Sequence, residues 1–561
     1  MTPVLASLLA LAALAAGYLV YSRWLARSLF RLRDDEKVPA HELEDGVDFC
    51  PTKSEVLWGH HFSSIAGAAP ILGPAMAIVW GWLPALLWIV FGVIFMGAAH
   101  DFGALVLSIR HGGRSVGSLT ETFIGPRSKL LFLIIIFFLI WLVGAVFAFA
   151  IAGLFAAFPA SILPVNLEIA VAVVIGWWGY KKKRSLLWPS IAALLGLYLV
   201  IFGTSSGVLW VPGEDSFLRA KEFWLVGLMV YAFIASSLPV WLLLQPRDLI
   251  NSHQLIVGLS ALYLGFFLTG PEFAAPAVGD LRALPAVFPL LMVTIACGSI
   301  SGFHGLVSSG TTSKQLNKAT DARPIGYGAM LCEAALALLA TMALASGKML
   351  GSEHGNAFGF IRQKSLDAGG SLPDVPTALK AFVGGASGFL ESLGLAPEVG
   401  AAVVAVLVIS FAATSLDTAM RIQRLVLAEI GESYGIRPLE NRWIGGLLAC
   451  GSVLVLIYAD YDAGAKSLWP VFGATNQVLA AFTLLVCALY LRTLGRRSLA
   501  YSLPAVFIMG VTFLAMAIQV KRDLGAEKWL VGGVGAVIAV LSVWVAVEGV
   551  LAWRRPASTP G

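Results

Sequence analysis

The sequence predicts an all-helical protein that crosses a membrane many times. Of its 561 residues, 58% are hydrophobic and 13% are charged, and the mean hydropathy is +0.83. These values lie far above those of a water-soluble chain of this size. Apolar runs near the ~20 residues that cross a bilayer recur along the chain. We predict about fifteen spans, at residues 4–22, 64–80, 82–109, 129–158, 164–180, 186–210, 223–244, 254–272, 284–303, 326–347, 398–420, 443–459, 470–493, 501–520 and 529–553.

The distribution of basic residues predicts the orientation of these spans. An outside N-terminus and an inside C-terminus place most of the 38 lysines and arginines on the cytoplasmic side, as the positive-inside rule requires. The net charge of +5 therefore follows from topology and does not indicate a nucleic-acid partner. The first run lacks a basic region before it, which favours an uncleaved helix over a signal peptide. The five cysteines show neither a disulfide framework nor a zinc motif.

The second predicted span interrupts its own helix. Paired histidines precede a Gly- and Pro-containing segment, 67–73, at the start of the apolar run. A helix break frees backbone N–H and C=O groups, which hydrocarbon cannot solvate, so they must face protein or a polar cavity. We therefore predict that this segment binds substrate, through Gly67, Ala68, Ala69, Pro70 and Gly73.

A second break is predicted in span 223–244, where the sequence reads Ser236-Ser237-Leu238-Pro239-Val240-Trp241. It lies five spans after the first, so the two interrupted helices cross in opposite directions. Interrupted segments at matching positions of opposed halves indicate an inverted-repeat transporter with a midplane site. We assign Ser236, Ser237, Pro239 and Trp241 to that site. The alternative is that both are ordinary proline kinks in a large bundle.

The end of the ninth span is rich in hydroxyl groups and glycines, from Ser299 to Ser313. Such a run offers oxygens for a cation and allows close approach of a backbone. We predict substrate and ion contacts from His304, and ion contacts from Ser308 and Ser309. The alternative is small-residue helix packing with an intracellular cap.

Buried carboxylates supply further candidates, because an ionised carboxylate inside a span costs at least ~2.5 kcal/mol unless it is paired or solvated. Asp101 and Glu333 are predicted to couple an ion, whereas Asp417 is expected to pair with Arg421 one helical turn later. Two antiparallel helices meeting near Gly81 would bring together a cluster that relays a proton, holds a metal or is only an interfacial hydrogen-bonded network. That cluster consists of His60, His61, His100 and Asp101.

Three regions are expected along the chain. Residues 1–63 form an N-terminal helix and a cytoplasmic lead-in, residues 64–424 form the inverted-repeat core, and residues 425–561 form peripheral helices. The segment 348–397 is the longest outside connection, and we interpret it as a tolerant loop rather than a cover for a vestibule. Asn476 and Gln477 fall outside this core, so no role in transport is predicted for them.

Five segments resemble the carbon starvation protein A (CstA) family in the order of their motifs. They are 45–74, Leu238–Asp248, Ser301–Thr312, Ser415–Arg421 and Leu468–Gln477. The resemblance implies a bacterial inner-membrane importer of peptides or pyruvate that is ion-coupled, acts when carbon is scarce and is related to the LeuT-type superfamily. One departure is His100-Asp101, which stands where some members have Gln-Asp, so the resemblance assigns no shared role to His100.

These observations together predict a LeuT-like 5+5 inverted-repeat carrier with additional peripheral helices. Its substrate carboxylate would lie between the two breaks, at the positive ends of half-helices. A proton would use Asp101, His304 and Glu333, and sodium would use Ser308, Ser309 and the 66–69 carbonyls; the proton is favoured. No cofactor or enzyme activity is expected. The alternatives are a membrane-embedded metalloenzyme built on the histidine cluster and a starvation sensor that does not transport.

Overall fold

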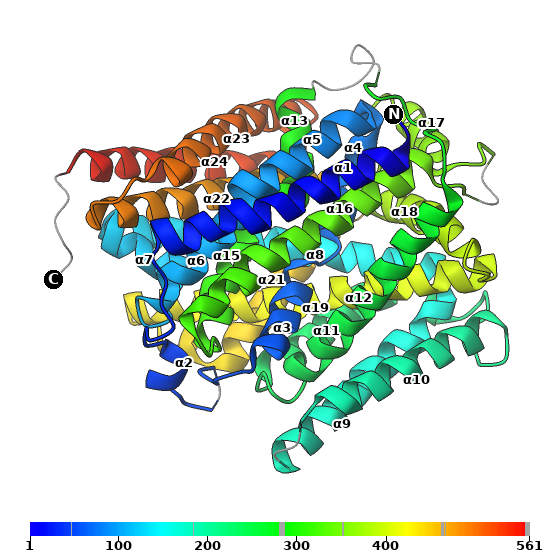
Figure 1. Cartoon of the computed structure of the whole chain (residues 1–561), viewed down its shortest axis with the longest axis horizontal. Coiled ribbons are helices and arrows are strands. Elements are labelled where there is room, and N and C mark those ends of the chain that lie inside the picture. The colour runs from blue at the N-terminus through cyan, green and yellow to red at the C-terminus, as the bar shows by residue number, and fades with distance from the viewer. Residues whose placement is uncertain are drawn as a thin grey trace.

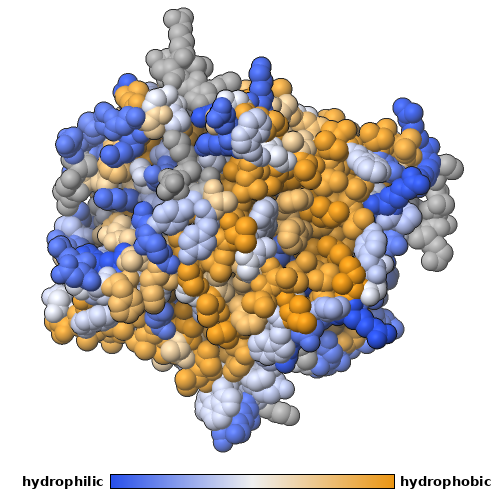
Figure 2. Space-filling model, turned by 180° about the vertical axis from the view of Figure 1, so that it is seen from behind, coloured by the Kyte–Doolittle hydropathy of each residue, from blue (hydrophilic) through white to orange (hydrophobic). Residues whose placement is uncertain are grey.

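The computed structural model describes residues 1–46, 48–182, 185–279, 287–349, 353–459, 461, 465 and 467–555. This part of the chain is helical, with two isolated β-bridges that join Thr52 to Leu316 and Lys348 to Asn356. Most long helices run roughly along the longest axis of the molecule (Figure 1). The surface carries a broad hydrophobic band between hydrophilic ends (Figure 2), as expected of helices that cross a bilayer.

Thirteen of the described helical segments are long and apolar enough to cross a membrane. In chain order they are α1 (Pro3–Ala16) with its continuation to Leu29, α3 with α4 (Ser54–Ile65, Ala69–Ala77), α5 with α6 (Trp82–Gly92, Ala98–Ile109), α8 (Pro126–Ala157), α9 (Ile162–Lys182), α10 (Leu187–Ser205), α12 (Leu244–Thr269), α16 (Ala329–Ser346), α19 (Pro397–Tyr434), α21 (Arg442–Ala459), α22 (Leu468–Thr493), α23 (Leu499–Gly525) and α24 (Trp529–Arg554).

Two of the fifteen predicted spans are absent from that list. One is α11 (Lys221–Ser237), which is 17 residues long. The other is divided into α13 (Val287–Thr294), α14 (Ala296–Ser299) and α15 (Gly302–Gly310). Both segments lie where a span is predicted, but neither is a single long helix.

The first predicted interruption is present. Helix α3 ends at Ile65, residues 66–68 separate it from the next helix, and α4 begins at Ala69 with Pro70 in its first turn. Proline suits that position because the first turn needs no intrahelical N–H bond from it. The span begins earlier than predicted, at Ser54, because the segment with His60 and His61 is helical and buried against α12.

The second predicted interruption is not a break within a span. Residues 238–243 join α11 to α12, and α12 begins at Leu244. Trp241 stacks on Tyr180, with 3.9 Å between the ring centroids, and Tyr180 precedes the basic end of α9 at Lys181 and Lys182. Pro239 therefore belongs to a connection at the predicted cytoplasmic side. A proline ends a helix as readily as it interrupts one.

The ninth span carries the second interruption instead. Ile295 separates α13 from α14, and Ile300 and Ser301 separate α14 from α15. The Ser299 hydroxyl donates to the Ile295 carbonyl at 2.8 Å and so satisfies a group that the break frees. The interrupted helices are thus seven spans apart rather than five, and an odd offset still makes them cross in opposite directions.

The packing around these two helices follows one pattern twice. Helix α4 packs on α16 as α15 packs on α6, and α3 packs on α12 as α13 and α14 pack on α22. The long helices α8 and α19 contact each other, as do α11 and α21. Helices α9 and α10 lie together at one side of the bundle (Figure 1).

The segment 348–397 is not a simple loop. It contains α17 (Ala357–Asp367) and α18 (Val375–Glu391), while residues 350–352 lie outside the described part. One face of α18 is buried, and the helix packs against α4, α8, α12 and α19. The expectation of a tolerant connection was wrong because the amphipathic pattern of α18 matches a helix that lies on the core.

Candidate substrate and ion site

The two interrupted helices meet directly. A Cβ at Gly73 of α4 would lie 2.8 Å from the Thr294 carbonyl oxygen, and one at Gly298 of α14 would lie 3.7 Å from the Pro70 Cα. At the first break, Gly67 faces the side chains of Ser415 on α19 and Phe147 on α8. The surrounding residues are buried. Glycine is required here because two backbones approach each other.

Asn476 on α22 holds the start of α15. Its Oδ1 accepts from the Phe303 N–H at 2.9 Å and from the Ser301 hydroxyl at 3.2 Å. Gln477 Nε2 donates to the Met292 carbonyl at 2.7 Å. The sequence analysis gave neither residue a role because it predicted that this span lies outside the core, although their motif belonged to the family resemblance.

Three predicted ion-coupling residues meet in one buried chain. His304 Nδ1 lies 3.1 Å from Asp101 Oδ2, and His304 Nε2 lies 3.3 Å from Glu333 Oε2. His100 Nδ1 lies 2.7 Å from Asp101 Oδ1. All four side chains are fully buried. An imidazole between two carboxylates can bind or pass a proton, because each ring nitrogen faces an acceptor.

The two predicted serines occupy different environments. The Ser309 hydroxyl donates to the Gly305 carbonyl at 2.7 Å and accepts from the Val116 N–H at 3.0 Å. The Ser308 hydroxyl is buried and has no hydrogen-bond partner among the described residues. Ser309 is therefore occupied within the protein, whereas Ser308 retains an oxygen that another group could bind.

The structure divides the predicted histidine cluster. His60 Nδ1 pairs with Asp248 on α12, and His61 Nδ1 lies 2.8 Å from the Thr312 hydroxyl, whereas His100 and Asp101 belong to the chain around His304. Within the described ranges, no group of three or more His, Cys, Asp or Glu residues could hold a metal ion. The arrangement gives no support to the metalloenzyme alternative.

The predicted residues of the second break lie apart from the first. The Ser236 and Ser237 hydroxyls donate to the Phe233 carbonyl, and Arg421 on α19 donates to the Leu238 carbonyl. Ser415, which faces Gly67, is six residues from Arg421 on the same helix, a separation of about 9 Å along its axis. Pro239 and Trp241 follow in the connection to α12, away from the break at Gly67.

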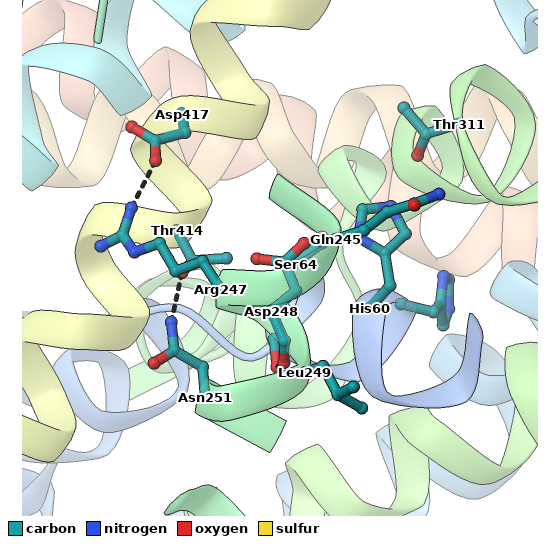
Figure 3. Close-up of polar contacts among 12 residues, drawn as sticks. His60, Ser64, Gln245, Arg247, Asp248, Leu249, Asn251, Thr311, Thr414 and Asp417 are labelled. Atoms are coloured by element: carbon teal, nitrogen blue, oxygen red, sulfur yellow. Dashed lines mark hydrogen bonds and ion pairs between the residues drawn. The ribbon is translucent and has the colours of Figure 1, made fainter. Parts of the chain in front are cut away.

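A second buried charge network surrounds Arg247 on α12. Its Nη1 donates to Asp417 on α19 and to the Tyr231 hydroxyl, the latter at 2.6 Å, and its Nε lies 3.8 Å from Glu168 Oε1. Figure 3 shows Arg247 reaching from its helix toward Asp417, with Asn251 directed at Thr414 nearby. Asp417 therefore does not pair with Arg421, which is directed to a backbone carbonyl instead.

A cavity of about 530 Å³ lies between α7 (Val116–Phe123), α8, α15 and α19. Phe49 of the lead-in lines it, and the Lys314 ammonium lies 5.3 Å from the Phe49 ring centroid. The neighbouring Cys50 N–H donates to the Lys314 carbonyl at 3.2 Å. Burial, and then Asp45, Asp48 and Glu44, raise the pKa of the Cys50 thiol to about 11, so it stays protonated at neutral pH.

Comparison with known proteins agrees with the sequence motifs. The family model described as "Carbon starvation protein CstA" matches residues 3–357 and 361–515. The chain belongs to the carbon starvation protein CstA family. The resemblance noted in the sequence is thereby confirmed.

Several bacterial relatives cover most of the chain. The "Peptide transporter CstA" of Bacillus subtilis is 30% identical over 98% of each chain. The "Pyruvate/proton symporter BtsT" of Escherichia coli is 30% identical over 90% of this chain and 80% of its own. These names support the prediction of a transporter over that of an enzyme. Together with the apolar helices, they identify a multi-pass protein of the bacterial inner membrane.

Two solved transporter structures are also similar to the chain. A mutant of the Eremococcus coleocola manganese transporter is 11% identical, with a TM-score of 0.45, over 91% of this chain and 99% of its own. MhsT in complex with L-phenylalanine is 14% identical, with a TM-score of 0.44, over 89% of this chain and 99% of its own.

Proposed function

We propose that this protein imports a small carboxylate-bearing nutrient, a short peptide or pyruvate, together with a proton. The observation that carries the proposal is the contact between two oppositely directed interrupted helices, at Gly73 and Thr294, beside the buried chain Asp101–His304–Glu333. The names of the relatives support both substrate classes, and one of them names a proton. The family name supports a role in carbon starvation.

The transport core in this proposal has ten segments in two matched sets. The first set is α3 with α4, α5 with α6, α8, α11 and α12; the second is α13–α15, α16, α19, α21 and α22. The repeated packing pattern supports this division. With this division, the core ends with α22 rather than at residue 424, and α9 and α10 lie outside it. The two sets still form an inverted repeat, but the second set contains other helices than the sequence predicted.

The substrate carboxylate would lie between residues 66–68 and 300–302. The N-termini of α4 and α15 both begin there, and a helix N-terminus attracts an anion through its free N–H groups and its dipole. Asn476 supports this geometry because its side chain, on α22, accepts a hydrogen bond from the Phe303 N–H in the first turn of α15. Gly67, Ala68, Ala69, Pro70 and Gly73 therefore remain substrate-site candidates.

The proton would bind to the chain of acids around His304. This residue lies in the first turn of α15, directly after the second interruption, and it contacts acids on α6 and α16. A displacement of α15 would therefore change the distances from one imidazole to two carboxylates. Proton binding and helix position would then depend on each other, which is the requirement for coupled transport.

Uptake into proteoliposomes tests the proposal. Purified protein would be reconstituted and offered labelled pyruvate or a labelled dipeptide under an imposed inward pH gradient, an imposed sodium gradient or neither. The proposal predicts accumulation of at least one substrate with the pH gradient alone. Accumulation driven by sodium alone would contradict the proton assignment, and binding without uptake would indicate a sensor instead.

A further inference from the structure

Glu168 is a buried carboxylate for which the proposed transport mechanism has no use. It lies in the first half of α9, outside the proposed ten-segment core, and its side chain is 1% exposed. A carboxylate in the interior of a membrane helix is costly unless a partner or a proton compensates it. Such residues therefore have a functional or structural reason to be there.

Its surroundings are polar but incompletely paired. The Ser410 hydroxyl on α19 donates to Glu168 Oε2 at 2.7 Å, while Oε1 has no hydrogen-bond partner among the described residues. Arg247 Nε, at 3.8 Å, and Nη2 also lack one within the described chain. Two free donors and one free acceptor thus stand close together without a bond.

The 3.8 Å between Arg247 Nε and Glu168 Oε1 lies within ion-pair range but is longer than a charge-assisted hydrogen bond. A guanidinium and an ionised carboxylate form hydrogen bonds of roughly 2.7–2.9 Å, and in a buried site they are strongly attracted. Arg247 remains charged in proteins, and its Nη1 is already bound to Asp417. A neutral carboxylic acid explains why Glu168 stays at a distance. The Ser410 hydroxyl suits both states, because it can donate to a carboxylate or accept from an acid.

Other charged groups lie around this pair. Asp248 follows Arg247 on α12 and pairs with His60 on α3, and Arg421 on α19 donates to a backbone carbonyl of the α11–α12 connection. Tyr231 on α11 binds both Arg247 and Asp417 through its hydroxyl. Each of these groups has a partner, and among the described residues Glu168 and Asp417 are the acids within ion-pair distance of Arg247.

We propose that Glu168 is a second proton-binding site of the carrier, at which Glu168 and Asp417 compete for Arg247. In the described conformation, Asp417 holds Arg247 and Glu168 holds a proton. When α19 moves away from α12, Arg247 is released from Asp417 and its Nε–H and Nη2–H groups bind Glu168. The Glu168 O–H bond then breaks, and the proton leaves to water on the side that has opened.

This inference rests on the proposed function and adds to it. The site differs from the chain Asp101–His304–Glu333, since it shares no residue or contact helix with it among the described contacts. Import would therefore move two protons with each substrate. With a pH difference of about one unit, each coupled proton contributes a factor of about ten to accumulation.

Infrared spectroscopy tests the proton directly, without transport. Purified wild-type protein should show a protonated-carboxyl C=O band that is absent from Glu168→Gln. Asn166→Ala is the matched control, because Asn166 also lies on α9 and, among the described residues, donates only to the Ile162 carbonyl of its own helix; it should keep the band. Asp417→Asn frees Arg247, so it should remove the same band while Glu168 is still present. Identical carboxyl bands in wild-type protein, Glu168→Gln and Asp417→Asn would overturn the proposal.

Proteoliposomes test the coupling. At an inward pH difference of about one unit, accumulation by Glu168→Gln relative to its substrate exchange should fall about ten-fold, and Asn166→Ala should match the wild type. An unchanged ratio in Glu168→Gln would overturn the second coupled proton. Absence of any transport by the wild type would instead refute the proposed function, and the infrared result would still decide whether Glu168 holds a proton.

Discussion

Gly73 lies so close to Thr294 that a Cβ on the glycine would stand 2.8 Å from the threonine carbonyl oxygen. The contact joins α4 to the residue before the interruption of the ninth span. It connects two helices that run in opposite directions and are both interrupted. The candidate site is built on this relationship.

The contact predicts the effect of enlarging Gly73. Gly73→Ala places a methyl group against backbone atoms that cannot turn away, so the two helices must separate, at a cost of about 1–3 kcal/mol. We expect transport to fall at least several-fold and thermal stability to decrease. Gly510→Ala on α23 is the control, because its added Cβ meets nothing within 4 Å. Equal uptake by the two variants would contradict the close contact.

Asn476 predicts a separation between stability and transport. Asn476→Ala removes the acceptor for the Phe303 N–H, and loss of a helix cap costs about 1 kcal/mol. Asn441→Ala is a matched control, because Asn441 Oδ1 caps α21 at the surface by accepting from the Trp443 N–H at 2.9 Å. We expect similar losses of thermal stability, with a strong loss of uptake for Asn476→Ala alone. Normal uptake by Asn476→Ala would contradict the assignment of α15 to the substrate site.

Glu333 predicts a selective loss of proton coupling. In Glu333→Gln, an amide that cannot release a proton replaces the acid beside His304 Nε2. With a pH difference of about one unit, accumulation should fall about ten-fold relative to substrate exchange. Glu398→Gln, in the exposed first turn of α19, should not change the ratio. Retained pH-driven accumulation in Glu333→Gln would exclude the Asp101–His304–Glu333 chain from coupling.

The connection between α11 and α12 predicts a structural role for Trp241. Its ring stacks on Tyr180, so Trp241→Ala should lower thermal stability by about 0.5–1.5 kcal/mol or more through lost stacking and burial. We expect little change in the apparent affinity for substrate in Trp241→Ala, Ser236→Ala or Ser237→Ala. A large increase in KM for these variants, with stability unchanged, would return residues 236–241 to the substrate site.

Sequence reasoning found the helices because hydropathy records which segments suit hydrocarbon. The cost of an ionised carboxylate inside an apolar span singled out Asp101 and Glu333, and the hydroxyl- and glycine-rich run at the end of the ninth span singled out His304. Sequence reasoning misplaced the second break because Pro239 terminates α11 rather than interrupting it, and this distinction depends on where the chain continues. The run of serines and glycines before His304 lies at the observed break. The sequence alone did not show that this segment contacts Gly73.

The Arg247 network also depends on contacts between helices, which the sequence alone does not show. Asp417 was assigned to Arg421 because an i,i+4 pair can be read from one helix, whereas its observed partner lies on α12. Glu168 received no assignment, although its position inside an apolar span was a detectable signal. Asn476 received no role because the predicted core was counted as ten consecutive spans, whereas the proposed core leaves out α9 and α10.

The decisive measurement is a structure of the protein with bound pyruvate or a dipeptide. We expect the substrate carboxylate between residues 66–68 and 300–302, within hydrogen-bond distance of backbone N–H groups at the starts of α4 and α15. A carboxylate bound at residues 238–243, or at any position that contacts neither interruption, would contradict it.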